Sequence, residues 1–294
     1  MSQHKTPLRY PGGKVKLAPF ITEIMDRNGL VGGHYIEPYA GGAGVAIELL
    51  LSGKVSHIHL NDSCLRLYAF WRSVLQRTQE LSRLIRAASL TVNEWRRQKE
   101  VFANPKNHCQ LEVGFSALYL NRCNRSGIMG AGLIGGVNQD GQWKMDARFP
   151  RNELIRRIEA IASRKRCITV RNWDAERFIT QYIPDISGAA LVYCDPPYFH
   201  KGSRLYLNHY KPRDHARISK IIQGKLLHPW IVSYDSAPEI MECYVKRRSF
   251  LYQLQYNVNR AYVGTEVLFF SDHLSLPIKS AVPGINLGLQ SLTV

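Results

Sequence analysis

The sequence predicts an α/β protein whose mostly parallel sheet is interrupted once by a mainly helical insert. Short apolar runs alternate with helical patterns near both ends of the 294-residue chain, which is typical of parallel sheets. Between about residues 66 and 166 this alternation stops, and arginine-rich helical patterns replace it. We therefore expect one domain built from residues 1–65 and 167–294, and an inserted domain at residues 66–166.

The composition narrows the class of protein further. A hydrophobic content of 45% is enough for one large core, or for a core and a subdomain, and a net charge of +16 favours a polyanionic partner, most simply nucleic acid. The six cysteines are scattered without metal-like spacing, which indicates reduced thiols and no metal site. No apolar run resembles a signal peptide or a membrane span, so we expect a cytoplasmic protein.

The first segment to note is the rigid, glycine-bearing stretch from Pro7 to Lys14, which leads into a helix that begins near Lys14. Paired glycines let a ligand approach the backbone, and Lys14 offers a point charge for a carboxylate. Taken alone, the simpler interpretation is a turn before a helix.

A stronger signal follows at residues 34–44. A short strand meets a glycine-rich turn and then a helix over residues 45–51, which is the first βα unit of a Rossmann-like fold. A second strand, over residues 55–60, ends in Asn61 and Asp62. Asp62 lies 21 residues after Gly41, about the spacing at which an acidic residue reaches ribose hydroxyls. The unit predicts a nucleoside-bearing cofactor, and the lack of a P-loop pattern argues against ATP.

The insert carries most of the excess charge, with 19 Lys and Arg residues against 8 Asp and Glu between residues 66 and 166. A polar segment runs from Tyr119 to Gly127, and the pair Asp140-Gly141 reads as a hairpin turn. A basic hairpin beside helices is a plausible reader of a DNA groove. The alternative is a solvated basic helical surface without a specific partner.

The sheet resumes at residues 167–170, and this strand ends in a polar cluster that includes Asp174. Asp174 is a candidate contact for the adenine of a cofactor, or equally an N-cap. A helix at residues 213–227, a strand at 230–234, a short helix, and strands at 250–258 and 266–271 complete the predicted sheet.

The most informative stretch is the apolar strand that ends in Asp195-Pro196-Pro197-Tyr198. Ligands of α/β sheets bind at the carboxyl ends of strands. The exocyclic amine of a base is a poor nucleophile, and two acceptors, the Asp195 carboxylate and the Pro196 carbonyl, would free its lone pair by taking its hydrogens. Tyr198 would supply a face on which an extruded base stacks. The alternative is a proline-rich turn that Asp195 caps and Tyr198 packs against.

Together these motifs resemble the Dam-like family of adenine-specific DNA methyltransferases, from Pro7 to about Ser271. Their order, with cofactor motifs first and the catalytic motif late, resembles the alpha group of amino-methyltransferases. The matching pieces are Gly12-Gly13-Lys14, Glu37-Pro38-Tyr39-Ala40-Gly41, Asn61-Asp62, Tyr119-Leu120-Asn121-Arg122, Asp195-Pro196-Pro197-Tyr198 and Glu266-Val267-Leu268.

The resemblance implies a class I methyltransferase with a seven-stranded sheet, S-adenosyl-L-methionine as cofactor and double-stranded DNA as partner. It implies catalytic roles for Asp195, Pro196, Pro197 and Tyr198. It implies cofactor-binding roles for Tyr10, Lys14, Glu37, Tyr39, Gly41, Asp62, Asp174 and Asp195, with Lys14 at the cofactor's carboxylate and Asp62 at its ribose. Asn121, Arg122, Asn124, Arg125, Ser126 and Lys144 of the insert would bind DNA.

Two departures from the family pattern bear on these expectations. Ala43 occupies the position of a glycine in the cofactor turn, which neighbouring glycines make tolerable, and the insert differs from the GATC readers, so the target sequence stays open. We expect methylation of the 6-amino group of a flipped adenine in DNA. The alternatives are methylation of the cytosine 4-amino group and a DNA-binding regulator on an inactive methyltransferase scaffold, with an RNA substrate less favoured.

Overall fold

The computed structural model describes residues 5–9, 14–199, 210–258, 260–277 and 288–289. Its centre is one sheet with the strand order β3-β2-β1-β4-β5-β7-β6-β8. The first five of these strands pair in parallel, and β7 and β6 continue the sheet antiparallel. The predicted seven-stranded, mostly parallel sheet is therefore confirmed, with the two-residue strand β8 added at one edge.

The elements follow the predicted order. The strands are β1 (His34–Glu37), β2 (His57–Asn61), β3 (Ile168–Arg171), β4 (Ala190–Cys194), β5 (Trp230–Asp235), β6 (Ser249–Val258), β7 (Arg260–Phe270) and β8 (Gly288–Leu289). The helices that cover the sheet are η1 (Lys14–Leu17), α1 (Ala18–Arg27), α2 (Gly44–Leu51), α8 (Ala175–Arg177), η5 (Phe178–Tyr182), η6 (Ile183–Asp185), α10 (Pro212–Lys225) and α11 (Pro238–Cys243).

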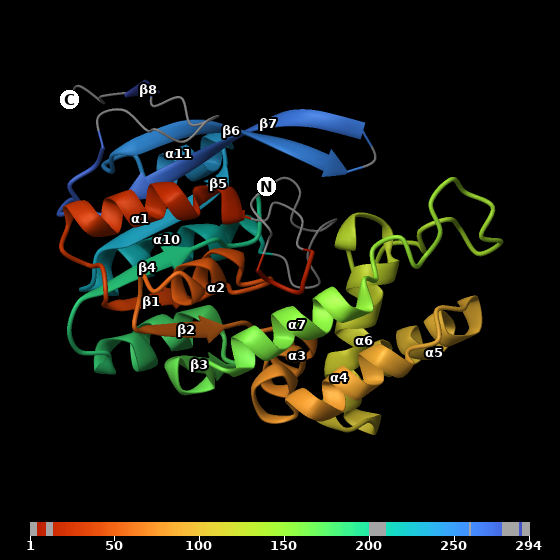
Figure 1. The fold of residues 1–294 in the computed structure, drawn as a ribbon. Coiled ribbons are helices and arrows are strands. Elements are labelled where there is room, and N and C mark those ends of the chain that lie inside the picture. Colours follow the sequence, from red (N-terminus) through yellow and green to blue (C-terminus); the bar gives the residue numbers. More distant parts are fainter. Residues whose placement is uncertain (1–4, 10–13, 200–209, 259, 278–287, 290–294) are drawn as a thin grey trace.

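Each central strand sends alternate side chains to two hydrophobic layers. Along β4, Leu191 and Tyr193 point into the layer of α1 and α2, while Val192 and Cys194 point into the layer of α10 and α11. Figure 1 shows the corresponding helices on the two faces of the sheet. This alternation places the next residue after β4 on the side of Tyr193. That residue is Asp195.

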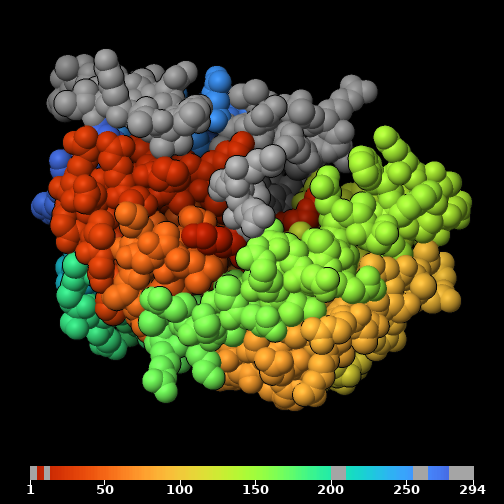
Figure 2. Space-filling view, in the orientation of Figure 1, coloured from red at the N-terminus to blue at the C-terminus, as the bar shows by residue number. Residues whose placement is uncertain are grey.

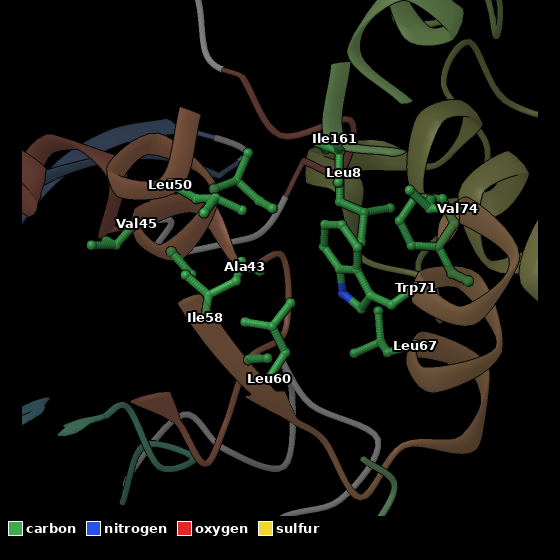
Figure 3. Close-up of a cluster of buried hydrophobic side chains, with 14 of the residues drawn as sticks. Leu8, Ala43, Val45, Leu50, Ile58, Leu60, Leu67, Trp71, Val74 and Ile161 are labelled. Carbon is green, nitrogen blue, oxygen red and sulfur yellow. The ribbon is translucent and has the colours of Figure 1, made fainter. Parts of the chain in front are cut away.

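The insert consists of helices and turns: α3 (Leu65–Gln76), α4 (Thr78–Ala87), α5 (Val92–Ala103), η2 (Pro105–Asn107), α6 (Gln110–Cys123), η3 (Arg125–Gly127), α7 (Arg151–Ala162) and η4 (Lys165–Cys167). Figure 2 shows it as a lobe beside the helices of the sheet. One buried hydrophobic cluster runs from the sheet into this lobe, through Leu60, Leu67 and Trp71 (Figure 3). The division of the chain into two domains stays a prediction.

The hairpin predicted around Asp140 is wrong. Residues 134–139 and 145–148 form turns with a bend between them, and between residues 66 and 166, all of them described, the only β pairing is an isolated bridge between Asn124 and Leu133. Gly135, Gly136 and Gln139 have positive φ angles, which break a strand ladder. The Gln139 side chain organises the loop instead, because its amide donates to the carbonyl of Ile134 at 2.8 Å.

A last feature of the fold concerns membranes. None of the helices in the described part of the chain is both long and apolar enough to cross a bilayer.

Candidate active site

Asp195 lies directly after β4, at the carboxyl end of a strand in the middle of the sheet. Ser233 of β5 donates a hydrogen bond to Asp195 Oδ1 at 2.6 Å, and the Tyr193 hydroxyl donates to Ser233 Oγ at 2.9 Å. Within the described part of the chain, no hydrogen bond or ion pair reaches Oδ2. One oxygen of this carboxylate is thus fixed by the protein, and the other is left to accept.

A buried lysine completes the surroundings of Asp195. The ammonium of Lys14 lies 3.6 Å from Asp195 Oδ1, donates to the Tyr198 hydroxyl at 2.6 Å and pairs with Glu266 Oε2 of β7. The Tyr198 hydroxyl donates to the other oxygen of Glu266, and the Tyr252 hydroxyl of β6 donates to Oε2. Lys14 is 5% exposed and Glu266 is 1% exposed, so this network is shielded from water.

Burial and charge act in opposite directions on the groups of this network. Burial raises the pKa of Asp195 above its usual value, and the positive charge of Lys14 partly offsets that rise. For Lys14, burial is the largest single effect and lowers the pKa, but Asp195 and Glu266 together outweigh it, so the pKa is raised. The lysine is therefore charged at neutral pH, and it favours the ionised form of Asp195.

The prolines and the tyrosine of the motif are held differently from one another. Pro196 is buried, Pro197 is half-buried, and Tyr198 is 3% exposed with its hydroxyl fixed by Lys14 and Glu266. A ring that stacks on a base must expose a face. The stacking role predicted for Tyr198 therefore requires its surroundings to rearrange when a base arrives.

The glycine turn after β1 is tied to the end of β2 by Asp62. This carboxylate accepts from the backbone N–H of Gly41 at 2.9 Å and from that of Cys64 at 2.8 Å. Burial raises the pKa of Asp62, and these two hydrogen bonds limit the rise. Ala43 adopts φ +45°, a left-handed conformation that glycine accepts without strain, so the departure from the family pattern carries a conformational cost here.

Glu37 and Tyr39 flank the same turn. Glu37 is buried at the end of β1, where its carboxylate accepts from the N–H of Ala46 at 3.3 Å. Burial raises its pKa to about 8. The half-buried Tyr39 shares a hydrogen bond of 2.9 Å with the hydroxyl of Tyr210. Because β1 is the neighbour of β4, this turn and Asp195 belong to adjacent strand ends.

Two other predicted cofactor residues have different outcomes. Asp174 is exposed and caps α8, since its carboxylate accepts from the N–H of Glu176 at 2.9 Å, so the N-cap interpretation accounts for its position. Tyr10 lies outside the described residues.

Three residues predicted to bind DNA are buried instead. Asn121 is 0% exposed and clasps the backbone of Arg9, accepting at 2.8 Å from its N–H and donating to its carbonyl at 2.6 Å. Arg122 is 6% exposed and donates to the carbonyl of Pro7. Asn124 is 0% exposed and accepts from Trp95 Nε1 at 2.7 Å. Their polar sequence pattern reflects structural hydrogen bonds, and DNA binding by these three residues stays a prediction.

The remaining three predicted DNA contacts lie at the surface. Arg125 and Lys144 are exposed, and Ser126, in the short helix η3 that follows α6, is half-buried with φ +58°. The turn is sharp here because Gly127 packs on the backbone of Arg9, where a Cβ would lie 2.4 Å from the Arg9 carbonyl oxygen. Arg125 in the same turn is exposed, and its guanidinium lies beside Gly132, where a Cβ would be 2.5 Å from Nη2.

Sequence reasoning did not assign roles to Ser233, Tyr252 and Glu266. All three sit on strands at positions that face the layer of Tyr193, and the pairing of Tyr252 with Glu266 across β6 and β7 brings two of them together. A carboxylate in an otherwise apolar strand was the available signal, because a buried charge needs a partner.

The strand order, the glycine turn of β1 and the Asp-Pro-Pro-Tyr turn after β4 together define a class I methyltransferase. The comparison with protein families is more specific. Residues 10–259 match the model of the D12 class N6 adenine-specific DNA methyltransferases, and the chain belongs to this family. It is an adenine-specific DNA methyltransferase, as expected from the sequence.

Two solved structures of the rRNA methyltransferase aviRa from Streptomyces viridochromogenes are also similar to this chain. Both are 16% identical and cover 89% of this chain, and they match over 86% and 85% of their own chains with TM-scores of 0.38 and 0.35. A similarity this low carries no argument about the substrate of this protein. A search of curated proteins gave no match.

Proposed function

We propose that this enzyme transfers the methyl group of S-adenosyl-L-methionine to the 6-amino group of an adenine that is flipped out of double-stranded DNA, with Asp195 as the acceptor of one amine hydrogen. The observation that supports this most is the asymmetric environment of Asp195. Ser233 donates a hydrogen bond to Oδ1 and Lys14 forms an ion pair with it, which leaves Oδ2 as the acceptor for a substrate. A base inside a duplex could not reach this oxygen, so the base must be extruded.

The residues at the ends of β1 and β2 fit S-adenosyl-L-methionine. Each carboxylate oxygen of Asp62 accepts one hydrogen bond from the backbone, and each has a further lone pair that can accept from a ribose hydroxyl. Gly41 adds no side chain to the turn that would face the ligand, and Tyr39 borders it. The cofactor, when bound, supplies an electrophilic methyl group.

The protein's own contribution is to prepare the amine. The lone pair of an adenine 6-amino group is delocalised into the ring, which makes the group a weak nucleophile. Asp195 Oδ2 and the carbonyl of Pro196 can each accept one amine hydrogen, and the fixed φ of Pro196 and Pro197 aims these acceptors in advance. The ionised Asp195 also stabilises the positive charge that develops on nitrogen as the methyl group is transferred.

The DNA contacts are proposed to come from the exposed part of the insert. Arg125, Ser126 and Lys144 remain as candidates, because each has surface outside the packed helices. The planar fork of an arginine matches the acceptors of guanine in the major groove. We assign base reading to Arg125 and phosphate contact to Lys144.

The experiment that tests this proposal compares two variants in methyl transfer from radiolabelled cofactor to DNA. Asp195→Asn is expected to abolish transfer while it retains cofactor binding, since the variant keeps the shape but replaces an acceptor with an amide that can donate. Asp62→Ala is expected to weaken cofactor binding by about 1–3 kcal/mol, the cost of losing charge-assisted hydrogen bonds. Turnover of Asp195→Asn within a few-fold of wild type would contradict the catalytic assignment.

A further inference from the structure

The predicted role of Lys14, binding the carboxylate of the cofactor, does not explain the contacts that this buried lysine makes. An ammonium has three donors. Those of Lys14 are directed at the Tyr198 hydroxyl, at Glu266 and toward Asp195. In this arrangement the donors of Lys14 are already engaged by protein groups, and none is left for the carboxylate of a cofactor.

The chain tolerates this charge in its interior at a considerable cost. Burying an isolated ammonium is unfavourable by several kcal/mol, and such a lysine normally loses its proton. Glu266 prevents this, because its carboxylate pairs with Lys14 and is itself held by the hydroxyls of Tyr198 and Tyr252. Lys14 therefore keeps its charge within 3.6 Å of Asp195 Oδ1.

We propose that Lys14 and Glu266 are positioning residues for methyl transfer: Glu266 keeps Lys14 protonated, and Lys14 keeps Asp195 ionised and turned with Oδ2 toward the amine. This inference rests on the proposed catalytic role of Asp195. The charges of the site show why Asp195 needs a cation beside it. The negative charge of Glu266 raises the pKa of Asp195, and without a cation between the two carboxylates nothing of comparable charge would offset this rise. A protonated Asp195 is no longer acceptor-only, and its function in preparing the amine is lost.

The positions of the surrounding residues on the sheet support this role of Lys14 and Glu266. Tyr193, Ser233, Glu266 and Tyr252 lie on four neighbouring strands, and all face the side on which η1 places Lys14. The lysine reaches across this row from a segment 181 positions away from Asp195 in the chain. A packing role alone would not require a charge at this position.

Other titratable groups face the cluster and enter its pH dependence. They are Tyr35 and Glu37 of β1, Tyr193 of β4, Tyr198 after it and Tyr252 of β6. Burial raises the pKa of Tyr35, Tyr193 and Tyr252 well above 10, so these three stay neutral in the range of an assay. The charge of Asp195 contributes to the raised pKa of Glu37, so the titration of Glu37 is coupled to that of Asp195 and enters the same profile.

The test is the pH profile of single-turnover methyl transfer at saturating DNA and cofactor, together with the cofactor affinity from calorimetry. In Lys14→Met the acid limb of the profile is expected to move up by about 1–3 pH units, the range over which a nearby cation shifts a carboxylate pKa. The affinity for S-adenosyl-L-methionine is expected to stay unchanged. Lys16→Met is the matched control, since Lys16 is exposed in the same turn, and its profile should coincide with wild type.

An acid limb that does not move in Lys14→Met overturns the proposal, and a weakened cofactor affinity in that case returns Lys14 to the cofactor's carboxylate. Glu266→Gln provides a second measurement should Lys14→Met fail to fold. Here the pKa of Lys14 falls, because one of its two counter-charges is gone, and the alkaline limb is expected to move to lower pH. An unchanged alkaline limb again refutes the proposal.

Failure of the proposed function would look different from failure of this inference. Asp195→Asn, measured in parallel, reports on the catalytic carboxylate alone. An active Asp195→Asn enzyme removes the catalytic assignment together with the inference. An inactive Asp195→Asn enzyme beside a Lys14→Met enzyme with a wild-type profile removes only the role of Lys14 and Glu266.

Discussion

Glu37 is a buried acid whose charge the fold opposes, and its replacement by glutamine should stabilise the protein in a manner that depends on pH. The side chain is 4% exposed at the end of β1, and burial raises its pKa from 4.5 to about 8. The charge of Asp195 contributes to this rise, while the hydrogen bond from the N–H of Ala46 opposes it. Glutamine keeps an oxygen for that N–H and removes the ionisation.

The size of the effect follows from linkage between protonation and folding. A group whose pKa is higher in the folded state contributes stability that is complete below its unfolded pKa of 4.5 and is lost as the pH rises through 8. Each unit of pKa difference corresponds to 1.36 kcal/mol, so the loss is about 3 kcal/mol at pH 7 and approaches about 5 kcal/mol above pH 8. Glu37→Gln avoids that loss.

The assay is urea unfolding of wild type and Glu37→Gln between pH 4.5 and pH 8.5 without cofactor. We expect the two free energies of unfolding to be similar near the acid end and to separate as the pH rises, with the variant more stable. A difference that does not depend on pH would refute the reasoning, because the fold would then not be opposing the charge of Glu37. Cofactor binding should weaken in the same variant, since the proposed role of Glu37 lies in that site.

Two further predictions concern the insert. Trp71→Phe removes the indole donor that reaches the Gly41 carbonyl at 3.0 Å, and we expect a loss of about 1–3 kcal/mol in stability together with weaker cofactor binding. Trp95→Phe removes a comparable bond to Asn124 far from that turn, so it should cost stability and spare cofactor affinity; equal effects on affinity would contradict a direct link through Trp71. Arg125→Ala should relax the preference at one flanking base and cost about 1–3 kcal/mol on the cognate site. Methylation of randomised flanks checks this, and an unchanged preference with a salt slope lowered by about one unit would make Arg125 a phosphate contact.

The parts of the fold that follow local patterns could be predicted from the sequence. Buried parallel strands are mostly apolar runs, so β4 and β5 were predicted within a few residues of their bounds. The glycine turn before α2 also followed from its sequence pattern, whereas the hydrogen bond from the Gly41 N–H to Asp62 was seen only in the structure.

The parts that depend on distant partners could not be predicted in the same way. Asn121 and Asn124 look like surface residues in a polar segment, and only the N-terminal segment and Trp95, which pack on them, make them structural. The pair Asp140-Gly141 carries a hairpin signal, yet Gln139 supplies side-chain hydrogen bonds that compete with a strand ladder. In both places tertiary contacts override a correct local pattern.

The case of Lys14 shows how the same limit applies to chemistry. Its type and position after two glycines are compatible with a ligand's carboxylate, and the sequence contains no information that ranks that partner against a carboxylate of the protein. The ranking comes from burial: a lysine that is 5% exposed needs a paired carboxylate to keep its charge, and Glu266 of the protein itself is paired with Lys14. An active site that needs an ionised Asp195 in a buried setting must hold a cation near it at every stage of the catalytic cycle. A cation carried by the cofactor would leave with it, whereas Lys14 stays beside Asp195 because Glu266 holds it in place.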